Sequence, residues 1–484
     1  MPTVLQPAFG KGELGPALFG RVDTAAYQVG LRIARNMYVH THGGISNRPG
    51  LEFVCPVRDH TARPVLLDFQ FKTTDTYIVI AEAGTFRFIR SGAAVLEDTK
   101  VINAITKADP AVVTTSTAHG YTSNDDVFLA GIVGMTELNG RFFRITVLTS
   151  TTFSLQDQYD AGATGIDSSG FTTYGSAGTS GKVLELATPY AQADLEELVY
   201  TQSADVMTIT HSTYGPRELN RTAVNTFTLT EPTFAPSIAD PTGVTVSVNG
   251  ADNNVLWKYK VTAIKKETLE QSLAGITAGL TVVSTDNTNP VSVEITGHGL
   301  VTGDEVEFTG LTEMTEINDR RFQVTKTDAN NFTLDNEVGL AYTDESTGGA
   351  NTCFATFDLS GTVASPTGTT IPDNTVVWNA VTGAIKYNIY RAKGDAGTFG
   401  FLAETQELSF TDDSTALQGT DLDLKPPTER NPFRVAGEFP AAVGYFQQRR
   451  LFGGSTNLPD TTDYSQTGNQ GNFTFSDPIR ADDA

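Results

Sequence analysis

Two histidines at equivalent places in a repeated segment are the first candidates for chemistry. His119 and His298 are each followed by a glycine and, a few residues later, by a carboxylate, Asp125 or Asp304. A metal site needs three or four converging ligands, and each copy of the repeat offers one histidine. We therefore predict that each His-Gly pair ends a strand and is held by turn geometry and one hydrogen bond, with no metal or acid–base role.

Other motifs with chemical potential also lack the context that their chemistry requires. The stretch from Gly10 to Gly15 matches the glycine fingerprint of dinucleotide sites, but no strand precedes it and no βαβ unit encloses it. No Gly-x-Ser-x-Gly nucleophile elbow occurs. The carboxylate pairs Asp412-Asp413 and Asp482-Asp483 lie in turn-like runs, whereas glycoside cleavage needs a separation that only a fold can set. We predict no enzymatic activity, no cofactor and no metal.

The elements that carry the histidines form a repeat of about 45 residues, offset by 179 residues without insertion or deletion. His119, Val127, Phe143 and Phe153 of the first copy correspond to His298, Val306, Phe322 and Phe332 of the second. A duplicated small β module is typical of a surface built for assembly or display. Asn139 and Asn318, each between a glutamate and an arginine, are predicted to fix a turn, with a glycan site as the alternative.

Composition and charge limit the class of protein. The chain has 484 residues, which suggests three or four domains. Short alternating runs of Thr, Ser, Val and Phe, with 45 Gly and 21 Pro, are typical of an all-β protein. The net charge of −23 argues against a protein that grips nucleic acid by its phosphates. Residues 1–100 have a net charge of +2. The acidic excess lies in residues 101–240, with a net charge of −9, and in residues 241–430, with a net charge of −14.

Two cysteines, Cys55 and Cys353, support neither a disulfide framework nor a zinc site. No apolar run approaches 18 residues, so we expect no stable membrane insertion.

The first part of the chain, residues 1–53, is interpreted as an irregular arm, one short helix and a loop. Asp23 or Thr24 is expected to cap a helix that continues to about His40. The apolar residues on one face of this helix would be Tyr27, Leu31, Ala34 and Tyr38. Gly43-Gly44 would end it.

The remaining segments are predicted to be strands. Residues 54–100 and 181–240 would form a β-rich core of antiparallel hairpins, interrupted by the first repeat module at 101–180. Residues 241–280 and 354–425, which contain Trp257 and Trp378, would form an immunoglobulin-type sandwich or two small ones, divided by the second module at 281–353. Residues 426–484 would return to the core.

The N-terminal pattern resembles the opening of the tail nozzle proteins of short-tailed bacteriophages, also called stabilisation or tail tubular B proteins. The resemblance rests on three sets of residues: Phe9–Leu14, Gly20–Asp23 and Arg48–Phe53; Thr188–Tyr190, Tyr200–Met207 and Pro216–Leu219; Pro440–Val443 and Phe446–Leu451. The repeat resembles small β-barrel modules inserted in such tail proteins, which share a name with the first catalytic-cysteine half-domain of ubiquitin-activating enzymes. That name implies no chemistry, because neither copy has a cysteine in its shared core. The sandwich pieces resemble fibronectin type III or Ig-like decorations of phage tails.

The resemblance implies a fold and a function. The fold would be a multidomain all-β protein with an incomplete β-propeller-like core, two inserted small β-barrel repeats and an Ig-like sandwich; family members continue past residue 484, so we expect the last part to be truncated. The protein would be a structural virion protein in the tail, assembled in the host cytoplasm, one subunit of a hexameric ring below the head-to-tail adaptor. It would extend the DNA ejection channel, let double-stranded DNA pass without specific binding, and support fibre or spike proteins.

Candidate contacts with the adaptor and with neighbouring subunits are Arg21, Tyr27, Arg32, Arg35 and Arg48. An acidic channel would repel phosphates and keep the duplex mobile. The alternative function is a receptor- or glycan-binding tail protein.

Overall fold

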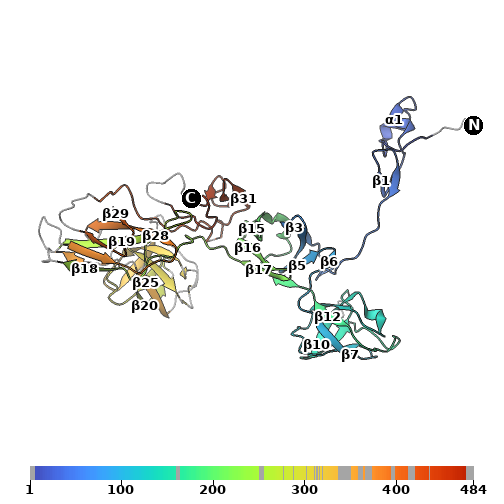
Figure 1. The fold of residues 1–484 in the computed structure, drawn as a ribbon, viewed down its shortest axis with the longest axis horizontal. Coiled ribbons are helices and arrows are strands. Elements are labelled where there is room, and N and C mark those ends of the chain that lie inside the picture. The colour runs from blue at the N-terminus through green and yellow to red at the C-terminus, as the bar shows by residue number, and fades with distance from the viewer. Residues whose placement is uncertain are drawn as a thin grey trace, which may run out of the picture. The chain divides into compact units, whose positions relative to one another are not determined.

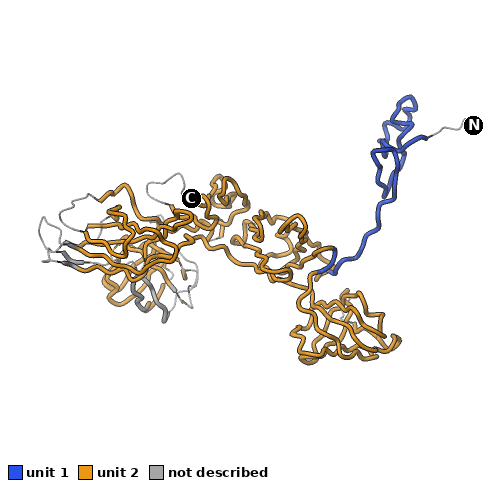
Figure 2. Tube along the Cα trace, viewed as in Figure 1, with its two compact units in different colours: residues 1–56, 92–94 blue, residues 57–91, 95–484 orange. Residues whose placement is uncertain are grey.

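A computed structural model describes most of the chain: residues 6–159, 164–249, 255–275, 277–286, 288–300, 302–309, 311, 314, 317–318, 320–335, 350–357, 363–365, 373–393, 398–412, 420–434 and 436–475. The described chain is all-β (Figure 1) and divides into two compact units. The first unit holds residues 1–56 and 92–94, and the second holds residues 57–91 and 95–484 (Figure 2). Asp482-Asp483 lies outside the described residues.

The first unit contains little regular structure. Its elements are η1 (Pro16–Leu18), α1 (Ala25–Gln28), and the two-stranded hairpin of β1 (Met37–Val39) and β2 (Ile45–Asn47), with the short strand β6 at Ala93–Ala94. The predicted helix from residue 23 or 24 to about His40 is therefore wrong beyond Gln28.

The helix ends early because long-range pairing overrides its apolar spacing. The amide of Leu31 donates to the carbonyl oxygen of Gly12 at 2.8 Å, and the amide of Leu14 donates back to Leu31 at 2.8 Å. A Cβ at Gly30 would lie 2.6 Å from the Leu14 side chain, so only glycine allows this close approach. Asn36, with φ 55°, then turns the chain into the hairpin.

In the second unit, two antiparallel sheets share one apolar core. The first sheet has the order β13-β5-β4-β3, and the second has the order β14-β15-β16-β17. Leu67, Phe69, Phe88 and Leu219 are among the buried residues of the common core. The elements are β3 (Val65–Lys72), β4 (Asp75–Glu82), β5 (Thr85–Arg90), β13 (Glu185–Ala187), η3 (Leu195–Glu197), β14 (Val199–Ser203), β15 (Val206–His211), β16 (Tyr214–Ala223) and β17 (Thr226–Thr230).

The first repeat module is a closed six-stranded barrel inserted in the chain between β5 and β13. Its strands run in the order β10-β11-β8-β7-β12-β9 around a core that includes Val127, Phe143 and Phe153. The elements are β7 (Lys100–Ile105), β8 (Val112–Thr115), β9 (Asp126–Ala130), η2 (Thr136–Leu138), β10 (Arg141–Thr149), β11 (Thr152–Gln156) and β12 (Thr179–Lys182).

The second repeat module is a closed barrel with the same strand order, β23-β24-β21-β20-β25-β22. Val306, Phe322 and Phe332 occupy its core at the places of their first-copy counterparts. The strands are β20 (Thr277–Asp286), β21 (Ser292–Glu294), β22 (Glu305–Thr309), β23 (Arg321–Lys326), β24 (Asn331–Asp335) and β25 (Ala350–Phe357).

The second barrel interrupts a body of two sheets, with the orders β18-β27-β30 and β26-β19-β28-β29. Strands from both sequence pieces pair in both sheets, and one core containing Trp257, Tyr259, Trp378 and Ile389 unites them, so the two pieces form one body. The strands are β18 (Thr245–Asn249), β19 (Val255–Lys265), β26 (Val363–Ser365), β27 (Asp373–Val377), β28 (Ala384–Lys393), β29 (Gly400–Thr405) and β30 (Ser409–Asp412).

A last sheet follows, with β31 (Ala442–Phe446), β32 (Arg449–Gly453) and β33 (Thr462–Tyr464). Its core groups Phe234, Phe433, Phe452 and Phe473.

Candidate functional site

The five predicted contact residues all lie in the first unit. Arg21 forms a two-pronged pair with Asp23, at 2.9 and 2.8 Å, on an exposed turn, and Tyr27 is exposed on α1, which follows. The guanidinium carbon of Arg32 lies 5.4 Å from the ring centre of Phe19.

Arg35 and Arg48 are exposed, and the amide of Arg48 donates to the carbonyl oxygen of Asn36, next to Arg35, at 2.8 Å. Arg32 and Arg35 were expected on the helix but lie beyond its end at Gln28, and Arg48 follows β2. They are spread over the unit and do not converge on one point.

The first unit has almost no core of its own. Among residues 6–56, Leu14 is the only large apolar side chain that is buried. Ten are exposed: Leu18, Phe19, Val22, Tyr27, Ile33, Met37, Tyr38, Val39, Leu51 and Phe53. A segment of this size cannot fold independently without burying apolar surface, and exposed apolar residues at this density mark an interaction surface. Sequence reasoning chose the arginines; the apolar residues around them are the stronger signal.

The repeated histidines are structural in both modules. The Nδ1 atom of His119 accepts the amide of Tyr121 at 2.9 Å, and its Nε2 lies 3.0 Å from the carbonyl oxygen of Thr149. His298 makes the same two contacts, with the amide of Leu300 at 2.9 Å and the carbonyl oxygen of Asp328 at 3.2 Å. Both ring nitrogens are therefore engaged with backbone. Across the part of the chain that the structure describes, no group of three or more His, Cys, Asp or Glu side chains could hold a metal ion.

The repeated asparagines hold a turn. The side chain of Asn139 accepts the amide of Ile132 and donates to the carbonyl oxygen of the same residue, both at 2.8 Å. Asn318 does the same with Leu311 at 2.9 Å. Because each amide group is used within its own module, the predicted turn role fits the geometry.

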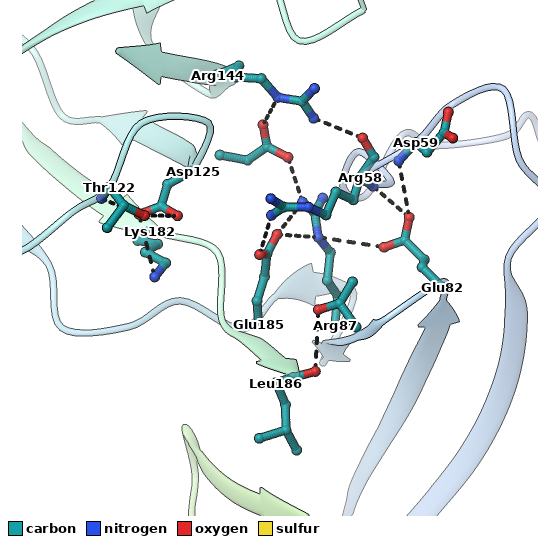
Figure 3. Close-up of polar contacts among 12 residues, drawn as sticks. Arg58, Asp59, Glu82, Arg87, Thr122, Asp125, Arg144, Lys182, Glu185 and Leu186 are labelled. Carbon is teal, nitrogen blue, oxygen red and sulfur yellow. Dashed lines mark hydrogen bonds and ion pairs between the residues drawn. The ribbon is translucent and has the colours of Figure 1, made fainter. Parts of the chain in front are cut away.

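A buried charge cluster, the first junction, connects the first barrel with the sheet that carries it (Figure 3). It consists of three arginines and three carboxylates: Arg58, Arg87, Arg144, Glu82, Asp126 and Glu185. Arg87 on β5 and Asp126 at the start of β9 are both fully buried, and Nη2 of Arg87 lies 2.6 Å from Oδ2 of Asp126.

Other side chains of the first junction form further hydrogen bonds with Arg87 and Asp126. Arg144 reaches Asp126 at 3.2 Å and the carbonyl oxygen of Arg58 at 2.9 Å, and Arg87 also pairs with Glu185. Burial opposes the charge of Arg87, but Glu185 and Asp126 hold its pKa above the ordinary value. Burial raises the pKa of Glu82, against the lowering influence of Arg87. The first junction is neutral when all six groups are charged, as a buried cluster must be to persist.

A second charge cluster, the second junction, attaches the second barrel to its host sheet at the strand equivalent to β9, which is β22. Asp125-Asp126 of the first module corresponds to Asp304-Glu305 of the second at the offset of 179 residues. Lys258 on β19 lies 2.7 Å from Asp304, and Lys260 lies 3.2 Å from Glu305. Although burial favours the neutral acid, Lys260 and Arg321 hold the pKa of Glu305 below the ordinary value.

The second junction also includes Arg321 on β23. This side chain is buried among three carboxylates. Arg321 pairs with Asp240 and, at 3.2 Å, with Glu307, while its backbone amide donates to Glu429 at 3.0 Å. Burial raises the pKa of Asp240 to about 6, against the attraction of Arg321. The second residue of this acidic pair, Asp126 or Glu305 at the start of β9 or β22, is thus the shared anchor of both modules. Sequence analysis noticed Asp125 and Asp304 only as possible partners of the histidines.

Comparisons with known proteins bear on the modules alone. Residues 108–183 and 286–354 each match the ubiquitin-activating enzyme E1 FCCH domain. The two matches cover less than a third of the chain. No curated protein matches the chain. No helix within the described ranges is long and apolar enough to cross a membrane.

Proposed function

We propose that this chain is a structural virion protein, a subunit of the tail nozzle ring of a short-tailed bacteriophage. The observation that carries the proposal is the first unit, which has one buried large apolar side chain and ten exposed ones among residues 6–56. Such a unit needs a partner surface to bury them. The net charge of the first unit is +2, whereas that of the rest of the chain is −25. A unit with so little net charge is suited to packing against other proteins.

The rest of the chain supports the same function. The sequence resemblance to nozzle proteins covers the first unit and returns at residues 188–221 and 440–451. Three antiparallel sheets belong neither to the barrels nor to the two-sheet body, and these would be blades of an incomplete β-propeller. The two-sheet body would be an Ig-like decoration. An acidic surface would keep the ejected DNA mobile in the channel, because phosphates find few cations there.

In this function the anchored barrels are outward braces for neighbouring subunits, fibres or spikes. Both are fixed to their host sheets through buried ion pairs, so each would hold a defined orientation when a partner pulls on it.

Docking on tailless phage heads tests the proposal. A chain without residues 1–53 should not bind the heads, and a Leu51→Ser/Phe53→Ser variant should bind much more weakly, because both side chains are more than half exposed. Leu66→Ser is the matched control, because this leucine on β3 of the second unit is as exposed as Phe53. Normal docking of the deletion variant, or equal loss in the control, contradicts the proposal.

A further inference from the structure

An arginine-lined cavity of about 730 Å³ lies within the second unit, where β16, the segment after β17, the second barrel, residues 429–434 and Phe439 meet. Three arginines line it, Arg217, Arg320 and Arg434, together with two glutamates, Glu231 and Glu429. The lining therefore carries a net charge of +1, in a chain whose total charge is −23. A positively charged concavity in an acidic protein selects anions from solution.

The guanidinium group of Arg217 is only partly used within the protein. Nη2 of Arg217 lies 2.7 Å from Glu231, but its buried Nε has no hydrogen-bond acceptor among the described residues. A buried donor without an acceptor is unfavourable, and an incoming oxygen would satisfy it. Arg434 is nine-tenths buried and pairs with Glu429 at 2.5 Å, which fixes its plane at the wall.

Arg320 comes from the repeat. Its guanidinium carbon lies 4.8 Å from the ring centre of Phe322, and the equivalent Arg141 lies 4.9 Å from that of Phe143. Arg141 does not line this cavity, so the two copies present the same arginine in two settings. The chain thereby contains its own control.

We propose that this cavity binds a sugar that carries one carboxylate, such as a uronic acid residue. The net charge of +1 matches a monoanion, whereas the two glutamates would repel a phosphate chain. A planar guanidinium offers two parallel donors to a carboxylate. Thr213 and Asn431 can bond sugar hydroxyls, and the rings of Tyr214 and Phe439 offer apolar faces to the sugar carbons.

An extended acidic peptide is the less favoured ligand. Pro216 and Pro232 line the cavity, and proline has no N–H with which to add a peptide strand. The volume also suits a discrete ligand of a few rings. The proposal does not depend on the nozzle function, because binding can be measured on the isolated full chain.

Calorimetric titration of the full chain with galacturonic acid, which carries one carboxylate, tests the proposal, with galactose as the neutral sugar, acetate as the bare anion and triglutamate as the acidic peptide. Galacturonic acid should bind at least tenfold more tightly than each of the others. Arg217→Gln and Arg320→Gln should each weaken it roughly tenfold or more, since each removes a charge-assisted bond. Arg141→Gln should leave it unchanged, and melting curves should confirm that all variants fold.

Several results would overturn the inference. No binding of galacturonic acid, equal binding of galactose, or equal weakening by Arg141→Gln excludes the site. Equal binding of acetate reduces it to a bare anion site, and tighter binding of triglutamate assigns it to a protein partner. A failed sugar titration with intact docking on heads would refute this inference and leave the nozzle proposal standing.

Discussion

Removing one charge from the first junction should loosen the first barrel from its sheet. In Asp126→Asn the side chain keeps its volume but loses its charge, and Arg87 and Arg144 lose a shared carboxylate. Breaking a buried ion pair from one side costs about 3–5 kcal/mol. Arg87 retains Glu185 and Glu82, so we expect the lower end, about 3 kcal/mol, or roughly 100-fold in an opening equilibrium.

Hydrogen–deuterium exchange read by mass spectrometry is the suitable assay, because a chain of several bodies does not unfold in one step. Amides of β9, β5 and residues 58–62 should exchange roughly 100-fold faster in Asp126→Asn, while the second barrel stays unchanged. Glu196→Gln is the control, because its pair with Arg63 is exposed at both ends. If exchange at the first junction is the same in Asp126→Asn and Glu196→Gln, the reasoning about the anchor is refuted.

Three further predictions concern the barrels and the second junction. Phe153→Ala and Phe332→Ala, at equivalent buried core positions, should each cost about 3–5 kcal/mol and should add independently in exchange experiments; strong coupling would contradict two separate cores. The pKa of Asp240 is raised from 3.8 to about 6, so its stabilising contribution is complete below about pH 4 and is lost as pH rises through 6. The second junction should open more readily at pH 7.5 than at pH 5, by about 1.4 kcal/mol, because about one pKa unit separates pH 5 from the folded-state pKa, and Asp240→Asn should abolish this difference; a variant with the wild-type pH profile would refute the assignment. His119→Ala should cost about 1–3 kcal/mol through its two backbone contacts, and EDTA should leave the melting temperature of the wild-type chain unchanged; a shift with EDTA would restore the metal hypothesis.

The local pattern of the sequence predicted much of the fold. The antiparallel hairpins expected in residues 54–100 are formed by β3, β4 and β5. In β3 the alternation of apolar and polar residues defines a strand with one buried face, on which Leu67 and Phe69 lie. The constant offset predicted two equivalent modules, and their matched core residues are equally buried. Trp257 and Trp378 pointed to the body that the second barrel interrupts, and both lie in its core.

Interactions between distant residues could not be predicted in this way. The helix expected to reach His40 ends at Gln28, because Leu31 pairs with residues 12–14, a contact that a helical spacing does not encode. The anchors were also missed, since Arg87 and Asp126 are 39 residues apart and Arg321 and Asp240 are 81 apart. The acidic pair preserved between Asp125-Asp126 and Asp304-Glu305 was a visible signal, but its partners on the host sheets, Arg87, Lys258 and Lys260, lie outside the repeat.

Electron microscopy of purified virions, with this chain labelled, tests the central claim most directly. The account predicts a ring of several copies, six by the resemblance, directly below the head-to-tail adaptor, with residues 6–56 buried in contacts with neighbouring proteins. Absence of the chain from mature particles, or its presence as an isolated copy with the first unit exposed, would contradict the account.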